Sequence, residues 1–461
     1  MTRIWFIFIL FIAFSCTNYY QKNLKFNQYF QAGQFEDAYQ LIAKDTKKHR
    51  KDKLLVLLNR GMVTSMLGKY TESNLAFEEA YRYADDLQKN YVNEGLALLT
   101  NPNMVPYKGE SYELLYIHYF KAFNYLRLND KEAALVESKR MNIVLTELES
   151  KWKSENKFKK DAFIHLLMGL IYDVNGDYNN AFIAYRNSYN IYQDEYQKLF
   201  GLGAPLQLKQ DLLRTSYLVG FLDEFNKYEK EFGFKYTPKP KAAGELIYLW
   251  HNGLGPIKSE WSIDFVISRG IGNNLFFVNN QLGLSYSFAM NDSEYRSSGL
   301  ADLSVIRIAF PKFADREPVF SKANLNVNGQ SITLEKVEDI NEVAHKSLKD
   351  RMHIELSKSL LRFALKKAAE LRIRKENQGL GAAVGVFNAL SEKADTRYWS
   401  TLPNSIYYGR MPLNSGRNEV KLRTQSPDGN SREHTANYEI KPGQVLFETF
   451  HSLETRAPNT Y

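Results

Sequence analysis

A short pattern recurs four times in the N-terminal half of the chain and constrains the fold more than any other feature. Each copy has a turn residue and a small residue five positions later, and three of the four have an aromatic residue two positions after the turn residue. In the last three copies, another small residue lies twelve positions before that small residue. Small side chains at this separation let consecutive helices cross closely, so the pattern predicts stacked helix pairs. The copies begin at Gly33, Gly68, Asn129 and Gly176, and the small pairs are Gly61 and Ser73, Ala122 and Ala134, and Gly169 and Ala181.

The pattern resembles the tetratricopeptide repeat (TPR), most closely between residues 165 and 188. The copies start 35, 61 and 47 residues apart. A regular TPR array repeats about every 34 residues, so insertions interrupt this one. After the last copy, residues 206–232 have a helical periodicity that fits one capping helix over the last repeat. The resemblance implies an all-α TPR-like superhelix over residues 24–235.

A TPR-like array has a concave surface that can hold a peptide or a helix of a protein partner through exposed side chains. The aromatic residues of the repeated pattern are expected in the core instead. On the first helices of the pairs, the candidates for groove contacts are Asn59, Tyr119, Asn124 and Arg127.

The composition of the chain changes after residues 236–243, which are rich in proline and lysine and predict a linker. Turn sequences at residues 427–430 and 441–443 predict two hairpins among β-strands. Apolar residues from Leu348 to Leu371 recur every three or four positions, which predicts one long helix from Val337 to about Asn377. Strands are predicted at residues 245–251, 261–268, 303–310, 323–327, 405–410, 418–425, 436–440 and 444–450, with Pro311 ending the third.

These patterns together predict the fold class α+β. An N-terminal all-α TPR-like superhelix is followed, at residues 244–452, by a β-rich domain with one long helix, and residues 453–461 are expected to be a tail. A β-sandwich or a small sheet capped by the long helix satisfies the C-terminal pieces. The long helix has ten basic and four acidic residues between positions 345 and 376. It is either a solvated outer face or a surface that contacts anionic lipid headgroups.

The start of the chain predicts export. Arg3 is followed by an apolar run of about eleven residues, too short to span a bilayer, which predicts a secretory signal at residues 1–15. Cys16 is the only cysteine, so the sequence can form neither a disulfide framework nor a thiolate metal site. Export also argues against nucleic acid as the partner of this chain, although its net charge is +8.

The segment from Ala13 to Cys16 resembles the lipobox of bacterial lipoproteins, from which Phe14 is a departure. The resemblance implies cleavage before Cys16, acylation of Cys16 and a short lipidated tether at residues 16–23. An ordinary cleaved signal that leaves a free thiol stays open. Thr17 is not the Asp associated with inner-membrane retention, so an outer-membrane lipoprotein facing the periplasm is expected. Exposure on the cell surface is the alternative.

Two short motifs stand out in the C-terminal half, at residues 252–258 and 394–403. In the second, Asp395 and Arg397 are expected to pair and order a loop, and Trp399 to fill a core position; ligand contact by these residues and Lys258 is the alternative. The motifs, N-G-L-x-P-x-K and A-D-T-R-x-W-x-T-L-P, resemble those of a family of bacterial lipoproteins with N-terminal TPR-like helices. The resemblance implies a cell-envelope setting, near peptidoglycan and outer-membrane assembly, and supplies no catalytic residues.

A search for catalytic and metal motifs finds neither H-E-x-x-H nor G-x-S-x-G, so we expect no enzyme activity and no cofactor. The leading hypothesis is a lipid-anchored scaffold that holds a protein partner in the TPR groove and contacts the membrane through its lipid, with peptidoglycan or anionic lipid as further contacts. One alternative is an envelope hydrolase or transferase with a site near Asp395, Arg397, Lys258 and Glu260. Another is a glycan-binding module that uses Trp250, Trp261 or Trp399.

Overall fold

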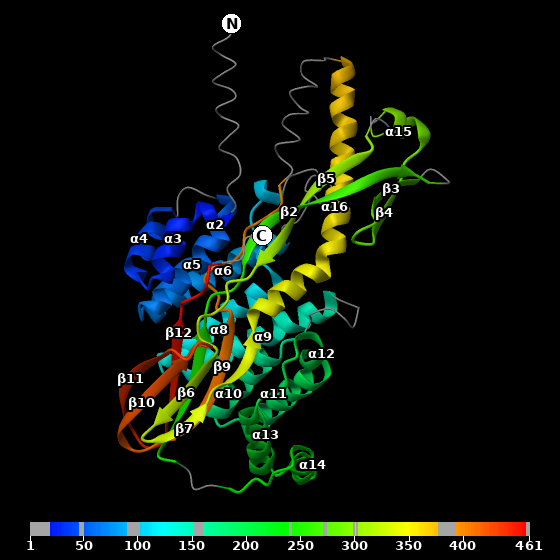
Figure 1. Ribbon diagram of the computed structural model, residues 1–461. Helices are drawn as coiled ribbons and strands as arrows, with labels where there is room; N and C mark the ends of the chain where they lie inside the picture. The colour runs from blue at the N-terminus through cyan, green and yellow to red at the C-terminus, as the bar shows by residue number, and fades with distance from the viewer. Residues whose placement is uncertain are drawn as a thin grey trace.

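The computed structural model describes residues 19–45, 50–89, 102–151, 160–238, 242–270, 274–297, 300, 303–376 and 393–457 (Figure 1). The predicted signal peptide and Cys16 lie outside these residues. No helix in the described part of the chain has the length and apolar character needed to span a membrane.

The N-terminal half folds into helix pairs, as the repeated pattern predicts. The turn residues that open the four copies all have positive φ, from 58° at Asn129 to 77° at Gly176. After the short α2 (Tyr19–Lys22), the pairs are α3 (Leu24–Gln31) with α4 (Phe35–Asp45), α5 (Lys53–Met66) with α6 (Tyr70–Lys89), α8 (Ser111–Arg127) with α9 (Lys131–Lys151), and α10 (Ala162–Val174) with α11 (Tyr178–Ile191). Short helical turns lie at Arg50–Asp52 and Pro102–Met104.

The small residues of the pattern lie where paired helices cross. A Cβ atom added to Gly61 would come within 2.5 Å of the Phe77 ring, so only glycine fits there without a shift. Ser73 Oγ donates a hydrogen bond to the carbonyl of Gly61 at 2.7 Å. Gly169 is covered by Tyr185 in the same way. The prediction of closely crossing helices is confirmed.

The end of the array differs from the prediction of one capping helix. Residues 206–232 form two helices, α13 (Leu206–Val219) and α14 (Leu222–Phe232). Gly220 separates them because its φ of +82° ends α13 in a left-handed residue. Before this pair, α11 continues through a π-helical turn at Tyr192–Tyr196 into α12 (Gln197–Phe200).

The strands of the described residues form three four-stranded sheets, ordered β12-β1-β9-β8, β11-β10-β6-β7 and β4-β3-β2-β5. β1 pairs with β12 in parallel and with β9 in antiparallel register. The strands are β1 (Gly244–Asn252), β2 (Ile257–Arg269), β3 (Asn274–Asn279), β4 (Leu284–Ala289), β5 (Val305–Ala314), β6 (Lys322–Val327), β7 (Gln330–Thr333), β8 (Glu335–Asp339), β9 (Ser405–Leu413), β10 (Gly416–Gln425), β11 (Ser431–Ile440) and β12 (Gln444–Ser452).

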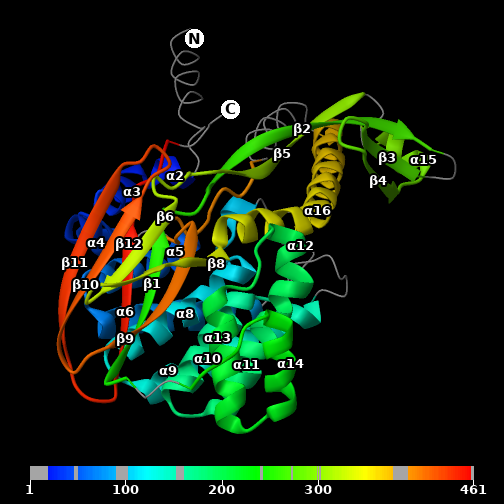
Figure 2. The ribbon, with the colours of Figure 1, turned by 60° about the horizontal axis from the view of Figure 1, so that its bottom comes forward.

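The first two sheets form a β-sandwich, which was one of the predicted arrangements (Figure 2). Its core contains Leu246 and Trp250 of β1, Leu325 of β6 and Leu422 of β10. The turn at residues 441–443 was expected to close a hairpin. It instead carries the chain from one sheet of the sandwich to the other, because β11 and β12 belong to different sheets.

The third sheet lies apart from the sandwich. The predicted helix is α16 (Ile340–Glu376), and it packs against β5 and α8, so the predicted small sheet capped by the long helix is found in the third sheet. β5 also continues through Pro311, which was expected to end it. Proline is tolerated there because β5 is an edge strand, where a missing N–H group leaves no ladder bond unmade. A short helix, α15 (Asp292–Ser297), lies beside this sheet.

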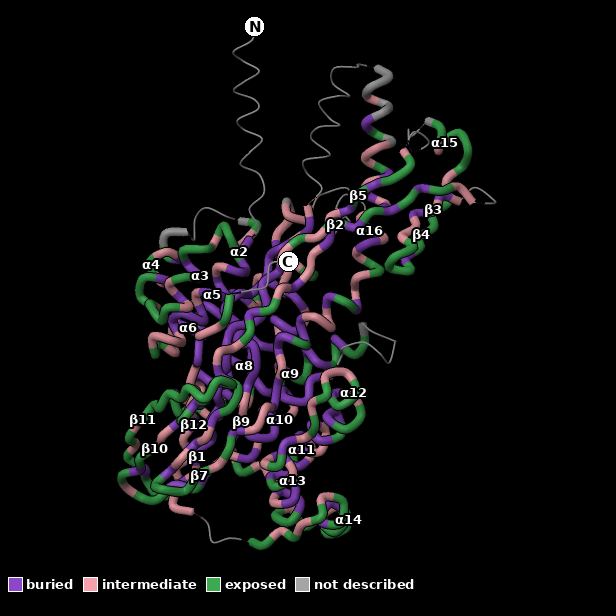
Figure 3. Tube along the Cα trace, in the orientation of Figure 1, coloured by how far each residue is buried: buried purple, intermediate pink, exposed green. Residues whose placement is uncertain are grey.

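The helices and the strands share one hydrophobic cluster. β1 is buried along nearly its whole length, because alternate side chains face the sandwich core and the helical array. Ile247 and Leu249 belong to the same cluster as Leu58 of α5 and Phe163 of α10. Figure 3 shows the buried residues concentrated around α8 and α10, where the array meets the sheet. Residues 236–243 therefore separate two types of secondary structure that pack into a common core.

Candidate functional site: the inner face of the helical array

The segment of residues 393–403, which carries the second C-terminal motif, lies against the first helices of three consecutive pairs. Ser400 Oγ donates to Asn27 Oδ1 of α3 at 2.9 Å, and Thr401 Oγ1 donates to Asn59 Oδ1 of α5 at 3.1 Å. The backbone N–H of Trp399 donates to a carboxylate oxygen of Glu113 of α8 at 2.7 Å. This inner face is where a TPR-like array would hold a peptide. In this protein a segment of the same chain occupies it.

Trp399 anchors the segment. Its side chain is 2% exposed, and its ring centroid lies 5.8 Å from those of both Phe77 and Phe120. The indole N–H donates to Thr401 Oγ1 at 2.8 Å, so the one polar atom of the ring is satisfied. The prediction that Trp399 fills a core position is confirmed.

Arg397 ties the segment to loops of the array. Its guanidinium donates to Asp395, as the sequence predicts, with Nη2 2.8 Å from Asp395 Oδ2. The same group donates to backbone carbonyls of Lys51 at 3.1 Å, Val105 at 2.9 Å and Pro102 at 2.7 Å. A guanidinium has five N–H donors in a rigid plane, so one arginine can bind several carbonyls at once. Arg397 thereby satisfies loop carbonyls that have no partner in a helix.

The four residues of the predicted enzyme site do come together, but around this segment. Lys258 Nζ lies 3.3 Å from the carbonyl oxygen of Arg397, and Glu260 accepts a hydrogen bond from the backbone N–H of Ala394 at 2.5 Å. Lys258 and Arg397 are 2% and 4% exposed, and neither cavity described below is lined by any of the four. Their polar atoms hold the chain itself, which leaves no room for a substrate against Lys258 or Arg397.

Lys258 also neutralises a buried carboxylate. Its Nζ lies 2.7 Å from Glu110 Oε1, and Arg351 of α16 contacts the same oxygen at 2.5 Å. Burial would raise the pKa of Glu110, but Arg351 and Lys258 outweigh it and lower the pKa to about 2. One carboxylate thus joins α8, β2 and α16.

The four residues that the sequence analysis proposed for groove contacts lie on this inner face. They were expected to be exposed, and this is wrong for three of them. Asn59, Tyr119 and Asn124 are buried, because other parts of the chain cover them. Asn124 Nδ2 donates within the array to Ser73 Oγ at 2.8 Å. Arg127 is partly exposed and donates to Glu448 Oε2 of β12 at 2.7 Å.

A cavity of about 130 Å³ remains between the array and the sheet. A hydrogen-bonded chain of side chains reaches it, from the Tyr119 hydroxyl to His251 of β1 and on to His451 of β12. The two histidines are register partners on adjacent strands, 200 residues apart in sequence. The lining residues are Ser65, Met66, Tyr70, Phe120, Phe123, Asn124, Arg127, His251, Thr449 and His451.

Both histidines are held in the neutral form. Burial, together with His451 and Arg127, lowers the pKa of His251 well below its usual value. Burial and Arg127 lower the pKa of His451 to about 3. Neutral imidazoles can donate and accept hydrogen bonds or bind a metal, but the described residues contain no group of three or more metal-ligating side chains. Sequence reasoning missed this pair because the two residues meet only through strand pairing.

Further ionic contacts fasten the later helices to the sheet. Arg410 of β9 lies 2.8 Å from Asp173 of α10 and 3.0 Å from Asp211 of α13. Tyr196 donates to Glu338 of β8 at 3.1 Å. Burial and the nearby Asp161 raise the pKa of Glu338 well above its usual value.

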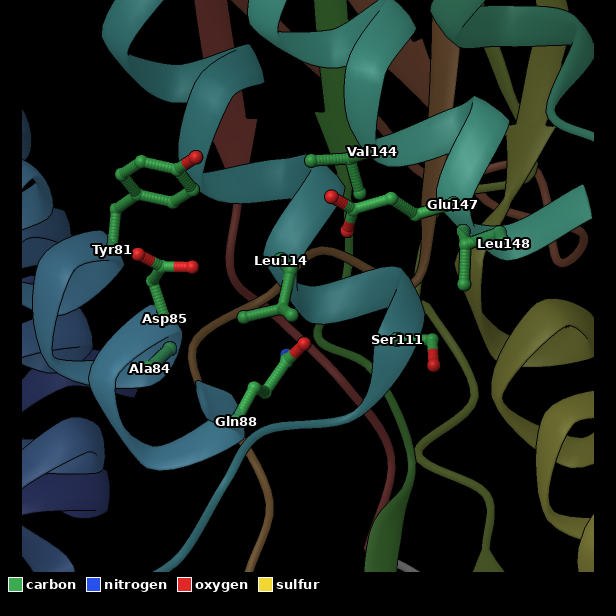
Figure 4. Close-up of a pocket in the computed structure, with 9 residues that line it drawn as sticks. All are labelled: Tyr81, Ala84, Asp85, Gln88, Ser111, Leu114, Val144, Glu147 and Leu148. Atoms are coloured by element: carbon green, nitrogen blue, oxygen red, sulfur yellow. The ribbon is translucent and has the colours of Figure 1, made fainter. Parts of the chain in front are cut away.

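A second, smaller cavity of about 40 Å³ lies between α6, α8 and α9 (Figure 4). Asp85 of α6 and Glu147 of α9 lie on opposite sides of it, with Leu114 of α8 between them. A space of this size holds a few water molecules at most.

The tryptophans predicted for glycan binding are mostly unavailable for it. Trp250 is 0% exposed in the sandwich core, and Trp399 is 2% exposed. A sugar ring cannot stack on a side chain that is covered on both faces, so this alternative is wrong for these two residues. Trp261 is partly buried against the main hydrophobic cluster.

No protein-family model matches the sequence, and no curated protein matches it. Among solved structures, MamA from Desulfovibrio magneticus RS-1 is 15% identical with a TM-score of 0.29, over 46% of this chain and 89% of that chain. BtubC from P. vanneervenii is 16% identical with a TM-score of 0.31, over 48% and 83%. A Podosopora anserina kinesin light chain protein with nearly identical TPR-like repeats is 14% identical with a TM-score of 0.31, over 46% and 92%. The TPR-like description of this chain rests on its own helix crossings.

Proposed function

We propose that this protein is a lipid-anchored scaffold of the cell envelope, held at the outer membrane by an acylated Cys16 and facing the periplasm. The observation that carries the proposal is that residues 393–403 fill the inner face of the array. The array and the sandwich then act as one rigid body, which binds a protein partner through outer surfaces. This departs from the expectation of a partner in the groove.

The last helix pair is the surface that we assign to the partner. Terminal repeats of a solenoid usually carry a polar outer face, because nothing stacks on them. Here Leu218 and Leu222, on either side of the Gly220 turn, are 48% and 60% exposed. α14 also lies at the opposite end of the molecule from α2, the first described element after Cys16 (Figure 1). An anchor at one end and an apolar surface at the other suit a protein that presents a partner to the envelope; peptidoglycan or anionic lipid are further contacts of this basic chain.

Two experiments in the native host test this proposal. Labelling with palmitate should mark the wild-type protein and not a Cys16→Ser variant, and that variant should leave the membrane fraction. A photo-cross-linking residue at position 222 should capture a protein that can be identified by mass spectrometry, whereas the same residue at Leu75, which is 68% exposed on α6, should not. Failure of the label would contradict the anchor, and equal results at the two positions would contradict the partner surface.

A further inference from the structure

β11 is a long, exposed edge strand of the sandwich. It is the outermost strand of the sheet ordered β11-β10-β6-β7, and all ten of its residues, Ser431–Ile440, pair with β10 in one unbroken register. Only Ile440 is buried. Figures 2 and 3 show the strand along the outer margin of the molecule. Such an edge presents a row of N–H and C=O groups that another strand can bind.

The other edges of the described sheets are protected from pairing. β7 has four residues and β4 has six, so each offers few backbone groups. β5 contains Pro311 and packs against α16, and β8 packs against α10. On β12, Arg127 of α8 donates to the carbonyl of Thr449 at 3.3 Å. Short length, proline and a covering element are common protections of edge strands. β11 has neither proline nor lysine, and its exposure shows that no element covers it.

The free backbone groups of β11 belong to its odd-numbered residues. In an antiparallel sheet, alternate residues of a strand bond to the neighbour on each side. On the β6 side of β10, the carbonyl of Glu419 accepts from the N–H of Asn328 at 3.2 Å. On the β11 side, the N–H of Ser426 donates to the carbonyl of Asn430 at 2.9 Å. Even-numbered residues of β10 thus bond to their even-numbered register partners on β11. The N–H and C=O groups of the odd-numbered residues of β11 point to the free edge.

A second copy of β11 can bind this edge in antiparallel orientation. The two copies are then related by a two-fold axis, so each contact between two different residues occurs twice. Directly opposed residues of antiparallel strands lie on the same face of the sheet. Odd-numbered residues therefore face odd-numbered residues of the second copy, and these are the residues with free backbone groups. The strand can form a complete ladder with itself.

The side chains of β11 fit this pairing when the axis passes through Thr435. Thr435 then faces its own copy, Glu433 faces Asn437, and Ser431 faces Glu439. Each carboxylate meets a side chain that can donate a hydrogen bond, and opposed threonines are a favourable pair. A shift of the axis by one residue toward the end of the strand would place Glu433 opposite Glu439, and like charges in opposed positions are destabilising. A shift the other way shortens the ladder by two residues.

We infer that β11 is an interface between two copies of this chain, in which the two outer sheets join into one antiparallel sheet with the register centred at Thr435. On the inner face of the joined sheet, Arg432 lies opposite Tyr438 and His434 opposite Ala436, so no like charges meet there. This inference does not depend on the lipid anchor. A dimer of this kind carries two copies of the surface on α13 and α14 that we assign to the protein partner.

A disulfide trap tests the register. The full-length chain carries Cys16→Ser, which removes the only native thiol. Thr435→Cys then places two thiols at the axis, where opposed Cα atoms lie about 5.5 Å apart, within the range of a disulfide. Asn437→Cys is the matched control, because it is exposed on the same face of the same strand but its two copies lie about 14 Å apart. We expect mild oxidation to give a disulfide-linked dimer with the cysteine at 435 and none with the cysteine at 437.

Sedimentation of the chain without introduced cysteines tests the dimer itself. Thr435→Pro removes an N–H group that points to the free edge and leaves the bonds to β10 in place. This variant should be a monomer with an unchanged circular dichroism spectrum, whereas the parent chain should be a dimer. A monomeric parent chain, equal cross-linking at 435 and 437, or a dimer that persists in Thr435→Pro would each overturn the inference. The cysteine variants decide the question if the proline variant fails to fold.

Discussion

Lys258 of β2 and Glu110 at the start of α8 are 148 positions apart in sequence, yet Lys258 Nζ lies 2.7 Å from Glu110 Oε1. Both side chains are buried. One belongs to the helical half and the other to the strand-rich half, so their ion pair can form only when both halves are in place. The same holds for the contacts of Arg397 and Trp399, and these contacts make the array and the sheets one structural unit.

Replacing Lys258 with methionine should lower the free energy of unfolding by about 3 kcal/mol, within the range for breaking a buried ion pair. Glu110 would keep Arg351 as a partner but lose Lys258, the second of the two cations that neutralise its charge. Urea unfolding measures the change. Lys349→Met, an exposed residue of α16, is the control and should cost much less. The double variant Lys258→Met, Glu110→Gln should recover part of the loss, and equal stability of Lys258→Met and the control would contradict the account.

Replacing Trp399 with alanine should cost about 3–5 kcal/mol, as for other large buried side chains. Because Trp399 lies between the halves, helices and strands should still unfold in one transition, at lower denaturant. Circular dichroism of the helices and fluorescence of the remaining tryptophans should give coincident curves. If the circular dichroism signal of the helices kept its wild-type denaturation midpoint in this variant, the array would fold without the segment, and the prediction would be contradicted.

The local features of this fold could be predicted from the sequence, because they depend on residues close together in the chain. The small residues Gly61 and Ser73 predicted where two helices cross, and Gly33 and Asn129, which have positive φ, predicted the turns. The long helix followed from its own periodicity. The prediction that Pro311 ends its strand was wrong. A proline is tolerated in an edge strand, and only the complete sheet shows that β5 lies at an edge.

The candidate site could be predicted only in part. The pairing of Asp395 with Arg397 is local and was expected. The contacts of residues 393–403 join positions about 290 to 370 residues apart, as with Ser400 and Asn27. No local sequence pattern predicts such contacts. His251 and His451 meet because β1 and β12 pair in parallel, which single strands do not specify.

His451 should make the protein less stable as the pH falls. Its pKa is about 3 in the folded protein and near 6.5 when unfolded, so below pH 6.5 the unfolded chain binds a proton that the folded chain does not. From pH 7 to pH 5, wild type should lose about 1–2 kcal/mol relative to His451→Gln. Urea unfolding at both pH values measures this.

His345 is the matched control for this prediction. Its hydrogen bond with Asp315 raises its pKa, so the folded chain binds the proton more tightly and gains stability below pH 6.5. His345→Gln should therefore be more destabilising at pH 5 than at pH 7, opposite to His451→Gln. The same direction of change in both variants would contradict the burial of the histidine pair.

Glu338→Gln should become more stable relative to wild type as the pH rises from 5 to 8. Burial and Asp161 raise the pKa of Glu338, so the folded wild type retains a proton that the unfolded chain releases, and its stability falls as the pH rises. Glutamine is neutral throughout and can still accept the hydrogen bond from Tyr196. Thermal melts across this range provide the comparison, and parallel curves for the two proteins would contradict the raised pKa of Glu338.

Hydrogen exchange of residues 393–403 tests the central claim most directly, because it asks whether this segment fills the inner face of the array in solution. The amide of Trp399 donates to Glu113 and that of Ala394 to Glu260, both at buried or partly buried sites. The account predicts that these amides exchange as slowly as those of α8. Exchange within seconds, while α8 stays protected, would contradict it and leave the groove open to a partner.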